Sequence, residues 1–187
     1  MCAQFYVDED TERVLQKLTG RPIAARHGTV RPGDSAAVLT GGSGRYGASQ
    51  MRWGLPRLAG SGLVINARSE SLAEKPMFRD SLKSRRCAVP AGGFMEWNEQ
   101  KEKVTFSDPL EPVLFLTGIF DLSQQVPRFA VVTRDANASV ARYHDRMPLL
   151  LSGDGLELWL NGDFEVCFRA EMPVLHAWLP VEQLSMF

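Results

Sequence analysis

The sequence predicts an α+β protein with a curved, mostly antiparallel, barrel-like β-sheet and a few flanking helices. Many short apolar segments are separated by Gly, Pro and polar turns, as in antiparallel sheets. They do not alternate with helices in the regular order of a parallel sheet. The 187 residues, 44% of them hydrophobic, suffice for one hydrophobic core, so we expect a single domain over residues 1–187.

Local signals define the elements in the first half of the chain. Residues 2–7 predict the first strand, and Asp10 or Thr11 is expected to cap a helix that runs to about Leu18, before Gly20-Arg21-Pro22. The further predictions are strands at 36–39, 50–55, 63–67 and 87–89, a glycine-rich hairpin loop at 41–44 and an amphipathic helix at 76–82.

The second half follows the same pattern. Residues 90–93 (Pro-Ala-Gly-Gly) predict a tight bend. The elements expected after it are strands at 94–98, 104–106, 113–120, 128–133 and 149–151, a weak helix at 136–141, and a helical turn or strand at 156–160. No internal repeat or linker is visible.

Composition excludes several classes of protein. No apolar run approaches the ~18–20 residues of a membrane span, and the acidic start of the chain lacks the features of a signal peptide. The three cysteines form neither a disulfide framework nor a zinc pattern; they are Cys2, Cys87 and Cys167. We therefore expect a cytoplasmic protein that needs no membrane, no metal and no organic cofactor.

Charge is distributed unevenly along the chain. The formal net charge is −1, but residues 21–103 hold 14 Lys/Arg against 7 Asp/Glu, and the remaining residues are acidic in balance. A basic middle segment can present one positive face to phosphates. Scattered surface charge is the alternative, and composition alone leaves both open.

The first two residues, Met1 and Cys2, have distinctive chemistry. Methionine is normally removed before a small residue, so the mature chain is expected to begin at Cys2. An N-terminal cysteine carries an α-amine and a thiol on adjacent carbons, and this pair condenses with an aldehyde to an imine and then to a thiazolidine ring. The reference pKa of the α-amine, ~7.7–8.0, leaves more free base near neutral pH than a lysine has. The alternative is that Cys2 is an ordinary residue.

Several segments place polar and special residues inside apolar surroundings. They are 51–56 (MRWGLP), 65–70 (INARSE), 75–79 (KPMFR), 85–87 (RRC), 89–97 (VPAGGFMEW), 133–137 (TRDAN) and 143–148 (YHDRMP). In order and spacing, together with Met1-Cys2, they resemble the SRAP family (SOS response-associated peptidase family), whose members crosslink to abasic sites in single-stranded DNA. The resemblance extends from residue 2 to about residue 160.

The resemblance implies four catalytic residues. Cys2 attacks the aldehyde of the ring-opened sugar, and Asn66 holds the α-amine and the linkage. Glu96 lies in an apolar strand that should raise its pKa for proton transfer, and His144 stands beside the abasic sugar. The alternatives are a turn-capping Asn66 and a solvent-facing Glu96. His176 has no such context and is assigned no role.

The resemblance also implies a DNA-binding surface. Arg68 offers a guanidinium fork to phosphate, and stacking of a base on a tryptophan contributes ~1–3 kcal/mol. The full set of candidates is Arg68, Lys75, Thr133 and Arg146 for phosphate, Trp53 and Trp97 for bases, and Pro32 as a wedge. Burial of both tryptophans in the core is the alternative.

The chain departs from the family at its start. The usual Met-Cys-Gly-Arg-Phe is Met-Cys-Ala-Gln-Phe here. Gln4 cannot supply the phosphate contact of the family arginine, which should weaken DNA binding and flatten its salt dependence. Ala3 restricts the backbone beside the nucleophile. The aminothiol itself is retained.

These features predict a monomeric enzyme of the DNA-damage (SOS) response, with abasic single-stranded DNA as its partner. It would lose Met1, form a thiazolidine crosslink through Cys2, and have possible lyase-type chemistry. Two alternatives stay open. One is a cysteine peptidase with Cys2 as nucleophile, His144 as base and Glu96 as orienting group. The other is a non-catalytic single-strand-binding module.

Overall fold

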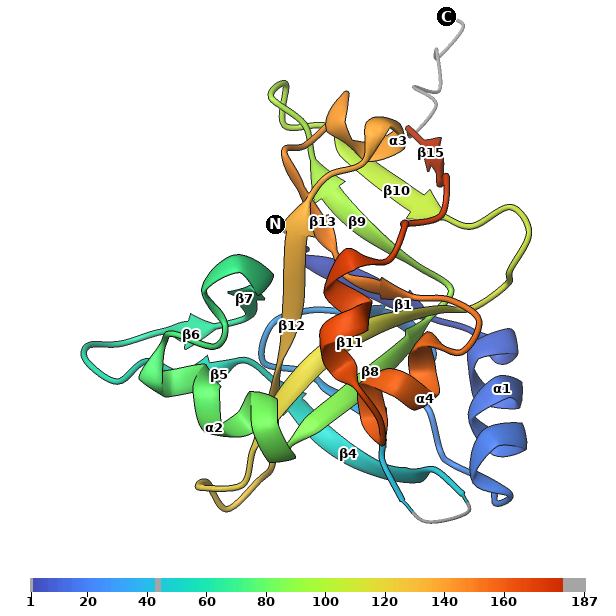
Figure 1. Cartoon of the computed structure of the whole chain (residues 1–187). Coiled ribbons are helices and arrows are strands. Elements are labelled where there is room, and N and C mark those ends of the chain that lie inside the picture. The colour runs from blue at the N-terminus through green and yellow to red at the C-terminus, as the bar shows by residue number, and fades with distance from the viewer. Residues whose placement is uncertain (1, 43–44, 180–187) are drawn as a thin grey trace, which may run out of the picture.

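The computed structural model describes residues 2–42 and 45–179. It contains two large β-sheets, a two-stranded sheet and a few short helices (Figure 1). Strand pairing is antiparallel except where β12 meets β4 and β7. The α+β prediction is therefore confirmed. Met1 and part of the predicted 41–44 loop lie outside the described residues.

The five-stranded sheet carries the N-terminal segment. Its order is β15-β10-β9-β1-β2, with neighbours antiparallel. The strands are β1 (Gln4–Val7), β2 (Gly28–Val30), β9 (Gly93–Trp97), β10 (Lys103–Ser107) and β15 (His176–Trp178). Phe5 is paired with Phe94, and Phe94 with Phe106, so the three rings share one face. That face points into the molecule.

The eight-stranded sheet is partly closed on itself. Its order is β13-β12-β4-β3-β8-β11-β14, with β7 beside β12 and an added β11–β12 pairing that closes five of the strands into a barrel. The strands are β3 (Ser35–Thr40), β4 (Gly47–Trp53), β7 (Asn66–Arg68), β8 (Arg86–Ala91), β11 (Leu114–Asp121), β12 (Arg128–Asp135), β13 (Arg146–Pro148) and β14 (Leu150–Leu151). This closure agrees with the predicted barrel-like core.

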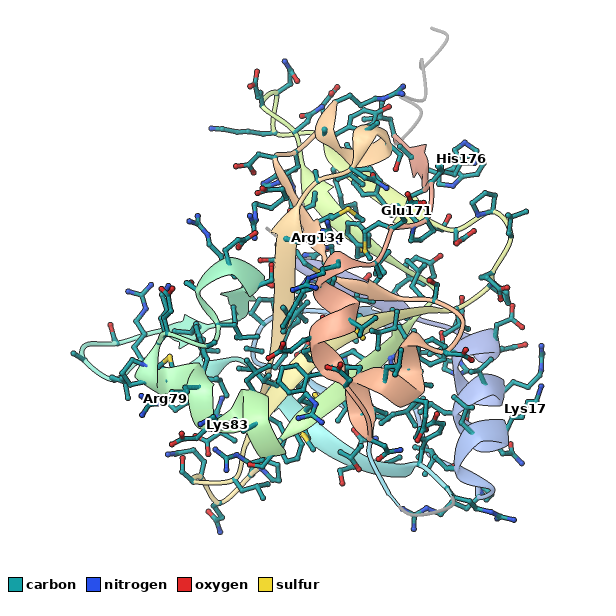
Figure 2. All side chains as sticks on the ribbon, in the orientation of Figure 1. Lys17, Arg79, Lys83, Arg134, Glu171 and His176 are labelled. Carbon is teal, nitrogen blue, oxygen red and sulfur yellow. The ribbon has the colours of Figure 1, made fainter. Side chains whose placement is uncertain are left out.

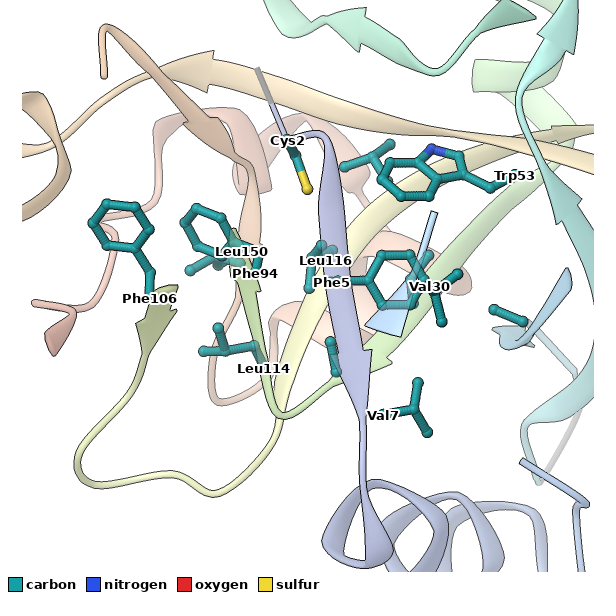
Figure 3. Close-up of a cluster of buried hydrophobic side chains, with 14 of the residues drawn as sticks. Cys2, Phe5, Val7, Val30, Trp53, Phe94, Phe106, Leu114, Leu116 and Leu150 are labelled. Atoms are coloured by element: carbon teal, nitrogen blue, oxygen red, sulfur yellow. The ribbon is translucent and has the colours of Figure 1, made fainter. Parts of the chain in front are cut away.

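Each face of the eight-stranded sheet packs a separate hydrophobic cluster. The inner cluster joins it to the five-stranded sheet and includes Cys2, Phe5 and Trp53 (Figure 3). The outer cluster lies under the helices and includes Leu15 and Trp159. The helices are α1 (Glu9–Thr19), η1 (Ser69–Ser71), α2 (Pro76–Ser84), α3 (Ala138–Ala141), α4 (Gly155–Leu160) and η2 (Phe164–Arg169). In the described part of the chain, no helix has the length and apolarity to cross a membrane.

Strand β12 is paired along one edge by two strands in series. β4 pairs only as far as Phe129, and Gly54, at φ 111°, then turns the chain away. This φ favours glycine. The two-stranded sheet of β5 (Leu55–Pro56) and β6 (Leu63–Val64) follows, and β7 returns with Asn66 opposite Val131. This detour brings Asn66 to the N-terminal strand.

Several local predictions differ from the structure. Asp8, not Asp10 or Thr11, caps α1. Its carboxylate accepts a hydrogen bond from the Thr11 backbone N–H, and the Thr11 hydroxyl accepts one from the Asp8 backbone N–H, which completes a capping box. Residues 90–91 continue β8 instead of bending, because both pair with β11. Strands β13 and β15 and the helix η2 were not predicted; β13 and β15 are three residues long, too short for a periodic signal.

Candidate active site

Cys2 lies at the meeting point of the two large sheets. It is fully buried, and its thiol donates a hydrogen bond to the carbonyl of Gln4 at 3.7 Å. Figure 3 shows the sulfur directed into the inner cluster. Burial, together with the negative charge of Glu96, raises the pKa of the thiol well above its usual range. The sulfur is therefore a neutral thiol in this state, which disfavours a preformed thiolate nucleophile.

Asn66 ties β7 to the N-terminal segment. Its side-chain amide donates to the carbonyl of Cys2 at 2.8 Å. Its Oδ1 is buried and accepts no hydrogen bond from the described residues. A buried acceptor without a donor carries a cost of ~1–3 kcal/mol. The side chain thus holds Cys2 in place and keeps one acceptor available beside it.

Glu96 points from β9 into the inner face of the five-stranded sheet. It is 2% exposed, and burial raises its pKa to about 7, with the nearby charge of Asp145 acting in the same direction. This is the direction expected from its apolar strand. Near neutral pH the carboxyl is therefore poised between its acid and base forms, as a proton shuttle requires.

His144 occupies the turn between α3 and β13. Its Nδ1 accepts the backbone N–H of Arg146 at 2.9 Å and lies 3.0 Å from a carboxylate oxygen of Asp145. Burial lowers the pKa of the ring. This shift favours the neutral form of the ring. Nδ1 also lies 3.2 Å from the carbonyl oxygen of Arg146, so the tautomer of the ring sets whether Nδ1 donates or accepts here. Since Asp145 acts on Glu96 and Glu96 acts on Cys2, the three segments that carry Cys2, Glu96 and His144 face one site.

Arg146 has a structural role that replaces its predicted phosphate contact. It is 7% exposed, and its guanidinium pairs bidentately with Glu70 at 2.9 Å, as well as with Asp135 and the carbonyl of Thr133. These bonds join β13, β12 and η1. Because both terminal nitrogens of the guanidinium are engaged inside the protein and the remaining Nε is buried, the side chain is not offered to DNA.

Two other DNA-binding candidates are also buried. Trp53 is fully buried, with its ring 5.1 Å from Phe5 and stacked on Phe129, and its indole N–H donates to the carbonyl of Ile65. No face of this ring is open to a base, so the core alternative holds for Trp53. The Thr133 side chain is fully buried too, and its hydroxyl cannot reach a phosphate in this structure.

The remaining DNA-binding candidates lie at the surface. Arg68 and Lys75 are exposed on either side of η1, and Trp97 is 37% exposed at the end of β9. Pro32 is exposed in the turn after β2. Gln4 pairs with Met95, the residue before Glu96 in β9. The structure thus leaves Arg68, Lys75 and Trp97 exposed to solvent.

Comparison of the sequence with models of protein families identifies the family of this chain. The family model of the SOS response associated peptidase (SRAP) family matches residues 1–184. The chain belongs to the SRAP family.

Several SRAP relatives carry informative names. The abasic site processing protein YoqW of Bacillus subtilis is 29% identical over 182 residues, covering 86% of this chain and 80% of the relative. YoaM of the same organism, also named an abasic site processing protein, is 35% identical over 67% of this chain and 61% of its own. The abasic site processing protein HMCES of Xenopus tropicalis is 30% identical over 64% of this chain and 43% of its own.

Solved structures share the SRAP fold at low sequence identity. A phage-related protein from Bordetella bronchiseptica superposes with a TM-score of 0.79 at 20% identity, covering 95% of this chain and 93% of the other. A protein from Bacteroides thetaiotaomicron gives a TM-score of 0.71 at 21% identity, with 95% and 91% coverage. These likenesses support the fold.

Sequence reasoning missed the partners of Arg146. Glu70 and Asp135 both stand in the quoted SRAP segments but received no role. The sequence shows that these segments carry opposite charges, but it does not reveal which acidic residue pairs with which basic one. Within residues 2–42 and 45–179, no group of three or more His, Cys, Asp or Glu side chains is placed to hold a metal ion.

Proposed function

We propose that this SRAP chain processes abasic sites in single-stranded DNA by forming a covalent crosslink through Cys2. One observation carries the proposal. Asn66 holds Cys2 through its carbonyl, and Glu96, whose pKa is about 7, lies close enough to raise the pKa of the Cys2 thiol. A clamped nucleophile beside a carboxyl that exchanges protons at neutral pH suits condensation with an aldehyde.

The reaction requires a free α-amine on Cys2, so Met1 must first be removed. The amine adds to the aldehyde carbon of the ring-opened sugar, and loss of one water forms an imine. The thiol then adds to the imine carbon, its proton passes to the nitrogen, and a thiazolidine ring closes. Glu96 in its acid form protonates the departing hydroxyl, and its base form accepts the thiol proton. His144 assists proton transfer to the sugar oxygen during ring opening.

The raised pKa of the Cys2 thiol favours this chemistry over peptide hydrolysis. A cysteine peptidase needs a thiolate stabilised by a nearby cation, whereas Cys2 faces Glu96. In ring closure the thiol can lose its proton to Glu96 at the moment of attack. The imine intermediate also permits lyase-type cleavage of the DNA strand, because an imine acidifies the adjacent sugar carbon. Closure of the thiazolidine ring consumes the imine and so prevents this cleavage.

Arg68, Lys75 and Trp97 are the residues we assign to DNA. Their exposure supports phosphate and base contacts. We propose that residues 1–187 act as one domain and as a monomer, in the cytoplasm at single-stranded regions of the nucleoid, during the DNA-damage response.

The test mixes protein with a single-stranded oligonucleotide that carries one abasic site. Denaturing gels and intact mass should show an adduct equal to protein without Met1, plus DNA, minus one water. Cys2→Ala should give no heat-stable adduct, but borohydride should trap its imine, and strand cleavage should increase. Cys167→Ala removes another buried thiol and should crosslink normally.

Two results would contradict the crosslinking function. One is a heat-stable adduct of Cys2→Ala. The other is trimmed wild-type protein that fails to crosslink although it binds the oligonucleotide, which would support the binding-module alternative. Release of peptides from an unrelated substrate would instead support a peptidase.

A further inference from the structure

The outward face of the five-stranded sheet carries exposed aromatic side chains on its strands. Side chains alternate along each strand, so those next to the buried Phe5, Phe94 and Phe106 point outward. The outward residues of β9, β10 and β15 include Trp97, Lys103, Thr105, His176 and Trp178. None of the outward strand residues of β1, β9, β10 and β15 is Asp or Glu. We call this surface the outer platform.

Two tryptophans are exposed on the outer platform. Trp97 is 37% and Trp178 is 56% exposed. His176 is exposed beside Trp178, with ring centroids 4.1 Å apart and planes inclined by 34°; Figure 2 shows the histidine projecting away from the ribbon. Exposed aromatic rings on a sheet form the kind of surface on which nucleic acid bases stack.

The outer platform begins at the Cys2 site. Glu96 and Trp97 are consecutive in β9, so one points to the site and the next points to the platform. The N-terminal end of β1, which follows Cys2, lies beside this end of β9 because the two strands are antiparallel. From β9 to β15 is two strand spacings, about 10 Å. A single strand that leaves the site therefore meets Trp97 first and the His176–Trp178 pair next.

We propose that the outer platform binds bases of single-stranded DNA on one side of the abasic site. Trp97 and the His176–Trp178 pair stack on successive bases, and Lys103 contacts a phosphate. This inference rests on the proposed function, because it places the lesion at Cys2. Stacking accepts any base, so the platform extends affinity without adding sequence preference.

The test uses oligonucleotides with a tetrahydrofuran analogue of the abasic site, which has no aldehyde and reports binding alone. One oligonucleotide carries a single nucleotide on each side, and two others carry about eight nucleotides on the 5′ or on the 3′ side. Fluorescence anisotropy should show that Trp178→Ala weakens binding at least about fivefold for one long flank only. Trp178→Phe should restore most of the affinity. Leu110→Ala, which alters a loop residue that is 88% exposed, is the matched control.

Three other outcomes would contradict DNA binding by the outer platform. Equal affinity of wild type and Trp178→Ala for all three oligonucleotides would do so, as would equal losses on every length. A change in oligomeric state caused by Trp178→Ala, with unchanged DNA binding, would assign the face to a second copy of the chain. Thermal melting checks that β15 stays folded.

Crosslinking is measured separately, with the short oligonucleotide carrying a true abasic site. Crosslinking by wild type, with no effect of Trp178→Ala on any flank, retains the proposed function and rejects the platform. No crosslinking, with a flank-dependent loss in Trp178→Ala, rejects the proposed function but keeps a single-strand-binding surface.

Discussion

Glu96 is the charged side chain that the inward face of the five-stranded sheet places next to Cys2. Strand alternation would bury an apolar residue at this position, and the neighbours Phe94 and Val104 on the same face follow that rule. A buried carboxyl resists ionisation, so its pKa rises to about 7. The same burial that raises its pKa makes its charged form a cost to folding.

Glu96→Gln should change the dependence of stability on pH. With a pKa of about 7 when folded and 4.5 as the reference, the folded chain holds the extra proton between these values. Stability therefore falls as pH rises through this window, and the full loss is present above it. Glutamine does not titrate, so the variant should gain up to about 3 kcal/mol relative to wild type between pH 4.5 and 8. Urea unfolding at several pH values measures this.

The matched control for this titration is Glu99→Gln, which changes an exposed carboxyl in the turn after β9. Its stability should parallel that of wild type at every pH. Parallel profiles for Glu96→Gln as well would mean that Glu96 titrates near its ordinary pKa in the folded protein.

At the scale of elements, Arg146 joins segments that are distant in the sequence. It links β13 to Glu70 in η1 and to Asp135 at the end of β12. On one side of these ion pairs lies His144, two residues before Arg146. The other lies beside Arg68, which is exposed and engaged by none of these bonds. Of these two arginines in similar motifs, Arg146 therefore stabilises the fold, whereas Arg68 is free of these internal bonds.

The pair Arg146→Gln and Arg68→Gln separates these roles. Arg146→Gln should lower the free energy of unfolding by about 1–3 kcal/mol, because a charged, bidentate interaction is lost. Arg68→Gln should leave stability nearly unchanged but reduce the salt-dependence slope of single-strand binding by about 0.7, the effect of one phosphate contact. Thermal unfolding and salt titrations of binding measure the two.

An unchanged salt slope in Arg68→Gln would remove Arg68 from the DNA interface. A reduced slope in Arg146→Gln under conditions where it remains folded would restore Arg146 as a phosphate ligand, and would require the ion pairs with Glu70 and Asp135 to open on binding.

At the scale of the whole molecule, Trp53 connects the two large sheets. It comes from β4 of the eight-stranded sheet, contacts Phe5 of the five-stranded sheet and stacks on Phe129. Its N–H bond to Ile65 also anchors the segment that leads into Asn66. The placement of Asn66 therefore depends on this packing.

Trp53→Ala should destabilise the fold by about 3–5 kcal/mol, the range for a large buried ring. Trp97→Ala is the matched comparison: it removes the same side chain from a partly exposed position and should cost less than about 1 kcal/mol. Urea unfolding of both variants measures the difference. Equal small losses would mean that Trp53 is not a core residue in solution.

Much of the fold could be predicted from local sequence. Strands such as β3 and β12 have clear apolar runs bounded by turns, and Asn66, Glu96 and His144 stand in segments that marked them as candidates. The short strands β13 and β15 could not be predicted, because three residues carry no periodicity and exist only through their partners β12 and β10.

The sequence by itself determined the types and order of the chemical groups: an aminothiol at Cys2, an amide, a carboxyl in an apolar strand, and exposed-looking arginines and tryptophans. Tertiary structure decided which of these are accessible. Trp53 and Trp97 look alike in sequence, as do Arg68 and Arg146, yet one of each pair is buried. Burial depends on side chains that arrive from distant strands, and local pattern does not record those contacts.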